Sequence, residues 1–329
     1  LMIVLLAWVG MTTIYADFHD EALEKWSWVW KAMLFAIFLP LTLRTRLRFE
    51  AAVLFMVLSA GAIIIGGAIK TLATSGGYGE LRLFVNDNTG LYEGSIISCV
   101  AIAIIPLIFW LARHGTIYPR NWMVKLFALA LTFACLLIPV GTQARTGLVC
   151  IAVLALLFIR QTKRRLLYLT GAALIGLAAI PFLPSAFSQR METIQDYKAD
   201  ESAATRVAVW KWTWEFVKEH PFGGGFDAYR INKIRYDLPV VDENGFDTGA
   251  IDRREIVDQG RAYHSSYFEM LGEQGFPGLI IWLLIHVGGV WRMEMLARIY
   301  KKRNRPDESW VAPLATALQN AQIIYLVGS

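Results

Sequence analysis

Long apolar blocks alternate with short polar segments along almost the whole chain. Many of them approach the ~20 residues that an α-helix needs to cross a bilayer, and each can borrow a turn from its flanks. The weak ten-residue alternation typical of a membrane β-barrel is not visible. The pattern therefore predicts an all-α, polytopic helical integral membrane protein. The apolar blocks fall near 1–16, 28–43, 49–69, 94–112, 122–140, 147–159, 166–184, 276–291 and 309–327.

Composition agrees with this fold class. Of the 329 residues, 56% are hydrophobic, which exceeds the roughly 45–50% of ordinary globular chains, and the mean hydropathy is +0.44. The three cysteines, Cys99, Cys135 and Cys150, all lie in apolar blocks and lack the spacing of metal ligands. We therefore expect no disulfide, no metal site and no cofactor.

Lysine and arginine collect in alternate loops, which the positive-inside rule assigns to the cytoplasm. The segments 17–27, 70–93, 141–146 and 185–275 are then expected outside. The net charge of +5 reflects this topology, so nucleic acid is not an expected partner. The basic loops carry Arg44, Arg46 and Arg48; Arg113 and Arg120; Arg160, Lys163, Arg164 and Arg165; and Arg292, Arg298, Lys301, Lys302, Arg303 and Arg305.

This topology predicts three regions. Residues 1–184 form about seven transmembrane helices, 185–275 form a large external loop, and 276–329 return to the membrane as C-terminal helices. Within the loop, residues 203–219 are predicted to form an amphipathic helix that lies along the outer membrane interface and is ended by Pro221 and the glycines 223–225. We interpret most of 227–262 as solvated loop. The apolar face of the predicted helix consists of Ala203, Val207, Trp210, Trp214 and Val217.

Two arginines are candidates for binding an anion. Arg145 lies in the short external turn 141–147, with no carboxylate near it in sequence. The alternative for Arg145 is a side chain that snorkels to lipid head groups. Arg206 lies in the first turn of the predicted amphipathic helix, one turn before Trp210, where it faces either lipid phosphate or a ligand. The alternative for Arg206 is an ordinary surface arginine.

His264 is the sharpest single candidate for catalysis. Ser266 and Glu269 match a capping box, so a helix is predicted to begin at Ser266 and to run inward toward Gly275. His264 would then lie just before the helix N-terminus, where free amide N–H groups attract anions and disfavour the imidazolium. A neutral imidazole beside a phosphate suits a general base. Taken alone, a structural loop histidine remains the alternative.

Together these features resemble the O-antigen ligase and O-antigen polymerase superfamily. The resemblance is carried by Arg145 between two spans, by Arg206 with Trp210 in R-x3-W, by the P-F-G-G-G-F stop, and by the run H-S-S-Y-F-E-M-L-G-E-Q-G-F-P-G from His264. It covers about 140–290. The N-terminal half, with K-T-L-A-T-S-G-G-Y-G-E-L-R over 70–82, is similar to the exosortase-associated subgroup of O-glycosylation ligases.

The resemblance implies a metal-independent, inverting glycosyltransferase of the bacterial inner membrane, with its catalytic loop 185–275 in the periplasm. The implied donor is an undecaprenyl diphosphate-linked glycan and the implied acceptor is the lipid A-core. His264 would be the base, and Arg145 and Arg206 would bind the diphosphate. Lys70, Arg82 and Tyr263 are further substrate-binding candidates, although Lys70 and Arg82 also suit interface anchors.

Other functions stay open at this point. A polymerase or a protein O-oligosaccharyltransferase of the same superfamily would use the same residues on another acceptor. A membrane transporter would instead carry ionisable groups deep within matching halves. A non-catalytic assembly scaffold would need none of the Arg145, Arg206 and His264 set.

Overall fold

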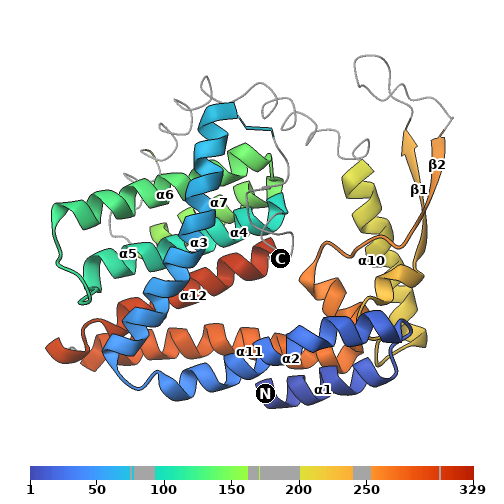
Figure 1. The fold of residues 1–329 in the computed structure, drawn as a ribbon, viewed down its shortest axis with the longest axis horizontal. Coiled ribbons are helices and arrows are strands. Elements are labelled where there is room, and N and C mark those ends of the chain that lie inside the picture. The colour runs from blue at the N-terminus through green and yellow to red at the C-terminus, as the bar shows by residue number, and fades with distance from the viewer. Residues whose placement is uncertain (75, 78–92, 162–169, 171–200, 240–252, 304) are drawn as a thin grey trace. The chain divides into compact units, whose positions relative to one another are not determined.

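The computed structural model of the chain is helical, with one two-stranded sheet in the part that it describes (Figure 1). The chain divides into two compact units. Unit 1 is Leu1–Thr42 with Glu192–Gly288, and unit 2 is Leu43–Met191 with Gly289–Ser329. The described residues are 1–74, 76–77, 93–161, 170, 201–239, 253–303 and 305–329.

The prediction of an all-α, polytopic membrane protein is confirmed. Four helical segments are long and apolar enough to cross a membrane: Arg46–Thr74, Gly94–His114, Trp122–Thr142 and Ser266–Arg303. Met2–Ile14 is a shorter apolar helix. The apolar block 166–184 apart from residue 170, Arg82 and the acidic residues 242–252 lie outside the described residues.

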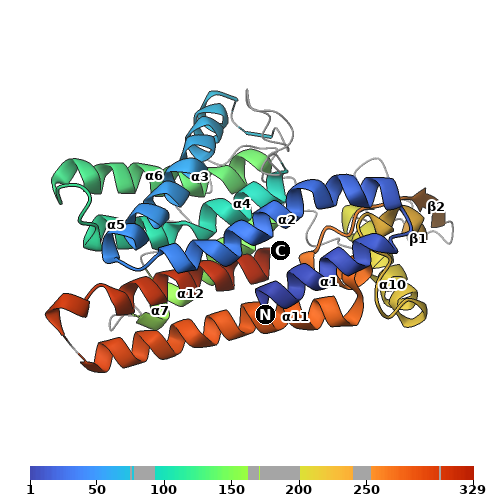
Figure 2. The same ribbon diagram turned by 60° about the horizontal axis from the view of Figure 1, so that its bottom comes forward.

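Unit 2 is a helical bundle. Helix α3 packs on α6, α4 packs on α6 and α7, and α12 contacts α4, α5 and α7 (Figures 1 and 2). The span from 94 to 114 is interrupted between α4 and α5, where Pro106 lacks the N–H that a continuous helix would use. The helices are α3 (Arg46–Thr74), α4 (Gly94–Ala103), α5 (Ile105–His114), α6 (Trp122–Thr142), α7 (Arg145–Gln161), η4 (Pro306–Glu308) and α12 (Val311–Gly328).

A buried carboxylate joins two of the predicted basic loops in unit 2. Glu50 is fully buried and accepts hydrogen bonds from Arg46 Nε at 2.7 Å and from the main-chain N–H of Thr116 at 2.6 Å. Arg46 also donates to the carbonyl oxygen of His114 over 2.7 Å. The start of α3 and the end of α5 therefore lie together, as a shared membrane face requires.

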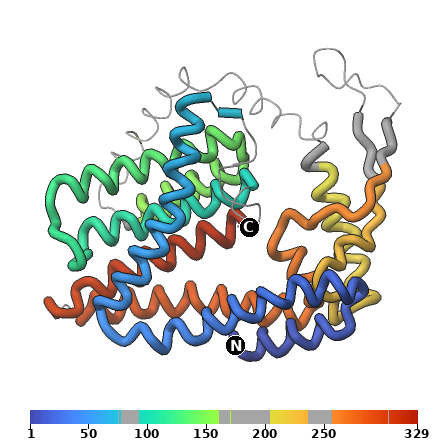
Figure 3. Tube along the Cα trace, in the orientation of Figure 1, coloured from blue at the N-terminus to red at the C-terminus, as the bar shows by residue number. Residues whose placement is uncertain are grey.

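Unit 1 combines two N-terminal helices with the polar loop. Helix α1 packs on α2, and α10 packs on the first strand of an antiparallel hairpin. Figure 3 shows the same chain path as a tube. The elements are α1 (Met2–Ile14), α2 (His19–Thr42), α10 (Glu201–Glu219), η3 (Ala228–Ile231), β1 (Lys233–Pro239), β2 (Arg253–Gln259) and α11 (Ser266–Arg303), which passes into unit 2 after Gly288.

The interpretation of 227–262 as mostly solvated loop is wrong for the two strands. β1 pairs with β2 in antiparallel register, from Lys233 opposite Gln259 to Pro239 opposite Arg253. The strand has a physical reason in the sequence, because Ile234, Tyr236 and Leu238 alternate with polar residues at the period of two that a half-buried strand requires. Ile234 is only 2% exposed.

The predicted apolar face of the amphipathic helix is partly wrong. α10 buries Val209, Thr213 and Val217 completely, whereas Val207 and Trp214 are exposed at 45% and 48%. Val217 is buried as predicted, whereas Val209 and Thr213 lie one residue before the predicted Trp210 and Trp214. The exposed apolar side chains remain available to form a surface groove.

Candidate active site

The glycine run 223–225 docks on the start of α11. As predicted, it ends α10 and forms a tight turn, with φ of +83° at Gly223 and +77° at Gly225. The N–H groups of Gly224 and Gly225 donate to the carbonyl oxygens of Gly272 and Glu273 over 3.0 and 2.9 Å. A Cβ atom on Gly223 would lie 2.5 Å from the oxygen of Glu273, so only glycine fits there.

A buried ion pair stabilises the contact between the glycine run and the start of α11. The Glu273 side chain is 4% exposed and accepts from Lys25 Nζ at 2.9 Å and from the main-chain N–H of Asp227 at 3.0 Å. Burial by itself would lower the pKa of Lys25, but the carboxylates of Glu273, Glu269 and Asp227 outweigh it and raise the pKa. Lys25 therefore stays charged and neutralises the acidic start of α11.

α11 begins at Ser266, as predicted. Its Glu269 side chain contacts a lysine instead of completing the capping box that the sequence suggested. The Glu269 carboxylate accepts from Lys25 Nζ at 3.4 Å. Within the described residues, no hydrogen bond joins the Ser266 and Glu269 side chains to the first-turn N–H groups. Glu269 therefore contributes to the contact between α11 and α2, as one of several carboxylates around the Lys25 ammonium group.

A tryptophan on α10 holds the loop that carries His264. Trp210 Nε1–H donates to the carbonyl oxygen of Tyr263 over 2.9 Å, and its indole stacks on Phe268 with ring centroids 5.0 Å apart. His264 itself is exposed and has φ of +49°, a left-handed conformation that costs a non-glycine residue about 1 kcal/mol or more. The surrounding contacts thus fix His264 in a strained position.

Tyr263 is buried beside this histidine. Its side chain packs with Val209 and Ile234 and is 2% exposed. Within the described residues, its hydroxyl group lacks a hydrogen-bond partner. Burial, with a further contribution from Glu273, raises the pKa of Tyr263 well above its usual range, so the phenol remains protonated. Its predicted role as a substrate ligand stays a prediction.

Arg206 lies one turn before Trp210 on α10, as the sequence predicted. Residues four apart on a helix are neighbours, with Cβ atoms about 5–6 Å apart. Arg206 is half-buried, and no described carboxylate forms an ion pair with it. Unit 1 therefore brings Arg206, Trp210 and the His264 loop together.

A small apolar cavity adjoins these residues. It measures about 310 Å³ and is formed by α10 and the first turn of α11. Val207, Trp210, Trp214 and Phe268 supply its apolar surface, and Lys211 and Glu215 also line it. Such a groove suits a hydrocarbon chain whose charged end lies near Arg206.

Arg145 and Lys70 belong to unit 2. Arg145 is the first residue of α7 and follows a two-residue reversal in which Gln143 has φ of +54°. The first-turn N–H groups of a helix attract anions, so the Arg145 guanidinium and the N-terminus of α7 both favour a bound anion. Lys70 lies near the end of α3, just before its last turn. The backbone of Gly77, just beyond α3, donates to the carbonyl oxygen of Gly141 over 2.9 Å.

The candidate residues therefore fall into two groups. Arg206, Tyr263 and His264 come together in unit 1, whereas Lys70 and Arg145 lie at helix ends of unit 2, and Arg82 lies outside the described residues. Sequence reasoning missed Lys25 as the partner of Glu273. An acidic residue in an otherwise apolar helix requires a cation or a hydrogen-bond donor, and that was the available signal.

The fold and these residues define a multi-pass membrane protein with a polar, arginine- and histidine-bearing loop. Comparison with protein-family models matches residues 129–283 to the family described as O-antigen ligase. Residues 1–116 match a family of unknown function, DUF5935. No curated protein matches the chain.

This match to the O-antigen ligase family over residues 129–283 supports the resemblance that the sequence motifs predicted. The match supports glycosyl transfer of the ligase or polymerase type, which in this family uses a lipid-linked glycan and an acceptor. His264, Arg206 and Arg145 all lie inside the matched region.

Proposed function

We propose that the chain is an O-antigen ligase, which transfers a glycan from undecaprenyl diphosphate to the lipid A-core oligosaccharide at the periplasmic face of the bacterial inner membrane. The observation that carries this proposal is the hydrogen bond from Trp210 to the carbonyl of Tyr263. It couples the helix of Arg206, an anion-binding residue, to the backbone of His264, a candidate base.

Catalysis of this transfer depends more on fixed positive charge near the diphosphate than on a general acid. As the acceptor oxygen attacks the anomeric carbon, the bond between that carbon and the diphosphate breaks, and the diphosphate leaves with the electron pair. Fixed guanidinium groups stabilise the charge that develops on it. Arg145 and Arg206 offer two-pronged contacts to phosphate oxygens, so no metal ion is required for this role.

His264 acts on the other substrate. Its neutral imidazole takes the proton of the acceptor hydroxyl while that oxygen attacks from the face opposite the leaving diphosphate. The single displacement inverts the anomeric centre, and such a base is typically worth ~10²–10⁴-fold in rate. The exposed position of His264 leaves room for a large acceptor.

The apolar cavity beside Arg206 supports a polyprenyl donor. The first isoprene units of the carrier fit against Val207, Trp214 and Phe268, and their diphosphate end then lies toward Arg206. The three tryptophans of α10, Trp210, Trp212 and Trp214, suit the head-group layer of a membrane. Lys70, Arg82 and Tyr263 remain predicted contacts to the glycan or diphosphate.

The test is transfer by the purified protein. It is incubated with undecaprenyl diphosphate glycan together with lipid A-core, with a candidate acceptor protein, or without an added acceptor, and the products are identified by mass. A lipid A-core product supports the proposal. A glycosylated protein or a lengthened donor glycan would replace it with protein transfer or polymerisation, and transport of the intact donor without a new glycosidic bond would refute an enzyme.

A further inference from the structure

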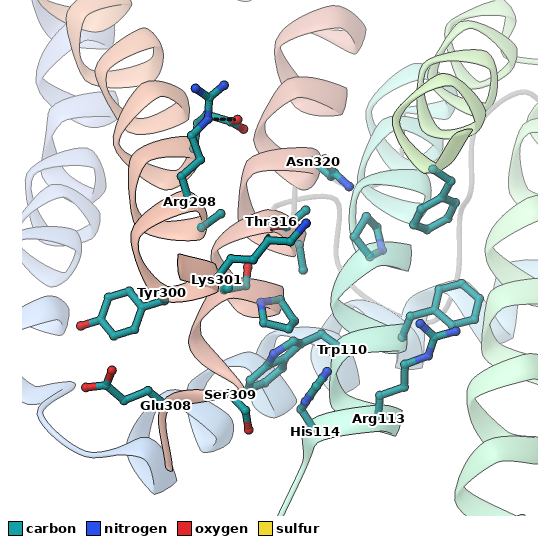
Figure 4. A pocket seen from close by; sticks show the side chains of 18 of the residues that line it. Trp110, Arg113, His114, Arg298, Tyr300, Lys301, Glu308, Ser309, Thr316 and Asn320 are labelled. Atoms are coloured by element: carbon teal, nitrogen blue, oxygen red, sulfur yellow. Dashed lines mark hydrogen bonds and ion pairs between the residues drawn. The ribbon is translucent and has the colours of Figure 1, made fainter. Parts of the chain in front are cut away.

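A second cavity lies wholly within unit 2, on elements that carry neither His264 nor Arg206. It has a volume of about 660 Å³ and is lined by α5, α7, α12 and the part of α11 after Gly288 (Figure 4). Its lining includes Arg113, Lys301 and Arg305, which belong to the basic segments that the positive-inside rule assigns to the cytoplasm.

The cavity has an excess of positive charge. Its carboxylates are Glu294 and Glu308. Glu294 is already engaged, because it accepts from Arg160 at 3.0 Å and from Arg298 at 2.7 Å. In the described part of the chain, no carboxylate lies within ion-pair distance of Arg113, Lys301 or Arg305.

Two cationic or polar groups point inward. Figure 4 shows the Lys301 side chain extending across the cavity and the His114 ring directed into it. The ring of Trp110 forms part of the wall between them. An anion in this space would meet Lys301 from one side and Arg113 with His114 from the other.

A buried amide adds a second, independent requirement. Asn320 lines the cavity and is 2% exposed, and its Oδ1 atom has no hydrogen-bond partner among the described residues. A buried acceptor without a donor is destabilising. The amide oxygen therefore calls for a hydroxyl or N–H group that enters the cavity.

The remaining wall is apolar. Pro106, Phe109, Phe158, Pro313 and Ala317 face the cavity from three helices. A ligand that satisfies all of these surfaces has a phosphate, a hydrogen-bond donor and a hydrocarbon portion. We propose that this cavity binds the phosphate ester of a hydroxyl-bearing anionic phospholipid, such as phosphatidylglycerol, from the cytoplasmic leaflet.

This proposal is independent of the proposed function. The site takes a lipid of the surrounding bilayer on helices outside the loop of His264, and its test measures binding alone. Juxtamembrane Lys and Arg gain about 1 kcal/mol each from anionic lipid, which corresponds to about fivefold in affinity. Two cations of the cavity are therefore expected to contribute about 30-fold.

Native mass spectrometry of the purified full chain in detergent measures the binding. Phosphatidylglycerol is expected to bind more tightly than phosphatidylcholine, and the pair Arg113→Gln with Lys301→Gln is expected to weaken it about 30-fold. The matched control is Arg120→Gln with Lys302→Gln, which removes the same charge from neighbouring positions outside the cavity. Equal binding of both lipids, or equal loss in both double variants, would overturn the proposal.

Two further arms make the test specific. Displacement of the lipid by millimolar glycerol 3-phosphate would show that the site takes a soluble phosphate ester and would overturn the lipid assignment. Asn320→Leu removes the unpaired oxygen, so it is expected to raise the midpoint of thermal unfolding while weakening phosphatidylglycerol binding about tenfold. Unchanged lipid affinity in that variant would refute the role of Asn320 as the acceptor of the hydroxyl group.

Discussion

The indole N–H of Trp210 donates a 2.9 Å hydrogen bond to the main-chain carbonyl of Tyr263, directly before His264. The same ring stacks on Phe268, four residues after His264. One side chain of α10 thus restrains the backbone on both sides of the candidate base. The helix that carries Arg206 thereby also sets where His264 lies.

The first prediction tests this coupling. Trp210→Phe keeps an aromatic ring against Phe268 but removes the donor to Tyr263. We expect turnover to fall about fivefold, the scale of one lost hydrogen bond of about 1 kcal/mol, with little change in the KM for the donor. Trp28→Phe is the control, because Trp28 is an exposed tryptophan of α2 that belongs to neither the cavity nor the His264 loop. Equal losses in both variants would show that Trp210 has no special role.

The second prediction concerns the arginines. Arg145→Ala and Arg206→Ala are each expected to reduce transfer by at least ~10²-fold, the scale seen when a donor to developing charge is removed. Lysine should rescue poorly because a point charge lacks the planar fork. Lys218→Ala, which removes an exposed cation of α10 paired with Glu215, should have little effect. Full activity in either arginine variant would eliminate it from the diphosphate site.

The third prediction concerns metal ions. If two guanidinium groups stabilise the leaving diphosphate, transfer by the purified protein should survive an excess of EDTA. The assay compares initial rates with EDTA alone and with EDTA followed by magnesium. Loss of activity that magnesium restores would show that a bound cation, rather than the arginines, stabilises the leaving diphosphate. The acidic residues 242–258 would then be its candidate ligands.

The fourth prediction concerns stability. Lys25→Met leaves the Glu273 carboxylate buried without its cation, and breaking a buried pair in this way costs about 3 kcal/mol or more. We expect a clearly lower midpoint of thermal unfolding in detergent, with partial recovery in Lys25→Met combined with Glu273→Leu. Lys31→Met on the exposed side of α2 is the control. Similar midpoints in Lys25→Met and Lys31→Met would refute the structural role of the pair.

Local patterns in the sequence were sufficient for most of the helices. The apolar block 49–69 corresponds to α3, the block 122–140 corresponds to α6, and the predicted start at Ser266 is the start of α11. These elements are set by hydrophobic length and by residues close together in the chain. The position of Arg206 one turn before Trp210 follows from helical periodicity alone.

Contacts between distant segments were not predictable in the same way. Lys25 and Glu273 are 248 positions apart, and nothing local pairs them. The buried stripe of α10 was misplaced because tertiary packing on β1 and Tyr263, rather than the tryptophan spacing, decides which face is covered. The β hairpin was missed although Ile234, Tyr236 and Leu238 alternate with polar residues, because the surrounding charges obscured this short period.

The last prediction concerns His264 as the base. A positioned general base is typically worth ~10²–10⁴-fold in rate, so removal of the imidazole should reduce transfer on that scale. Because φ is +49° at this position, His264→Asn is a better probe than His264→Ala, since asparagine tolerates the left-handed conformation. Both variants should lose most of the rate.

Donor binding should survive the same substitutions. The arginines hold the diphosphate, whereas His264 acts on the acceptor hydroxyl, so the loss should appear in turnover rather than in donor affinity. Donor affinity is measured directly with the purified variants, and single-turnover rates are measured with the donor at saturation. If His264→Asn instead weakens donor binding severely while single-turnover transfer stays near wild type, His264 is a ligand of the phosphate. The proton of the acceptor must then be removed by another group.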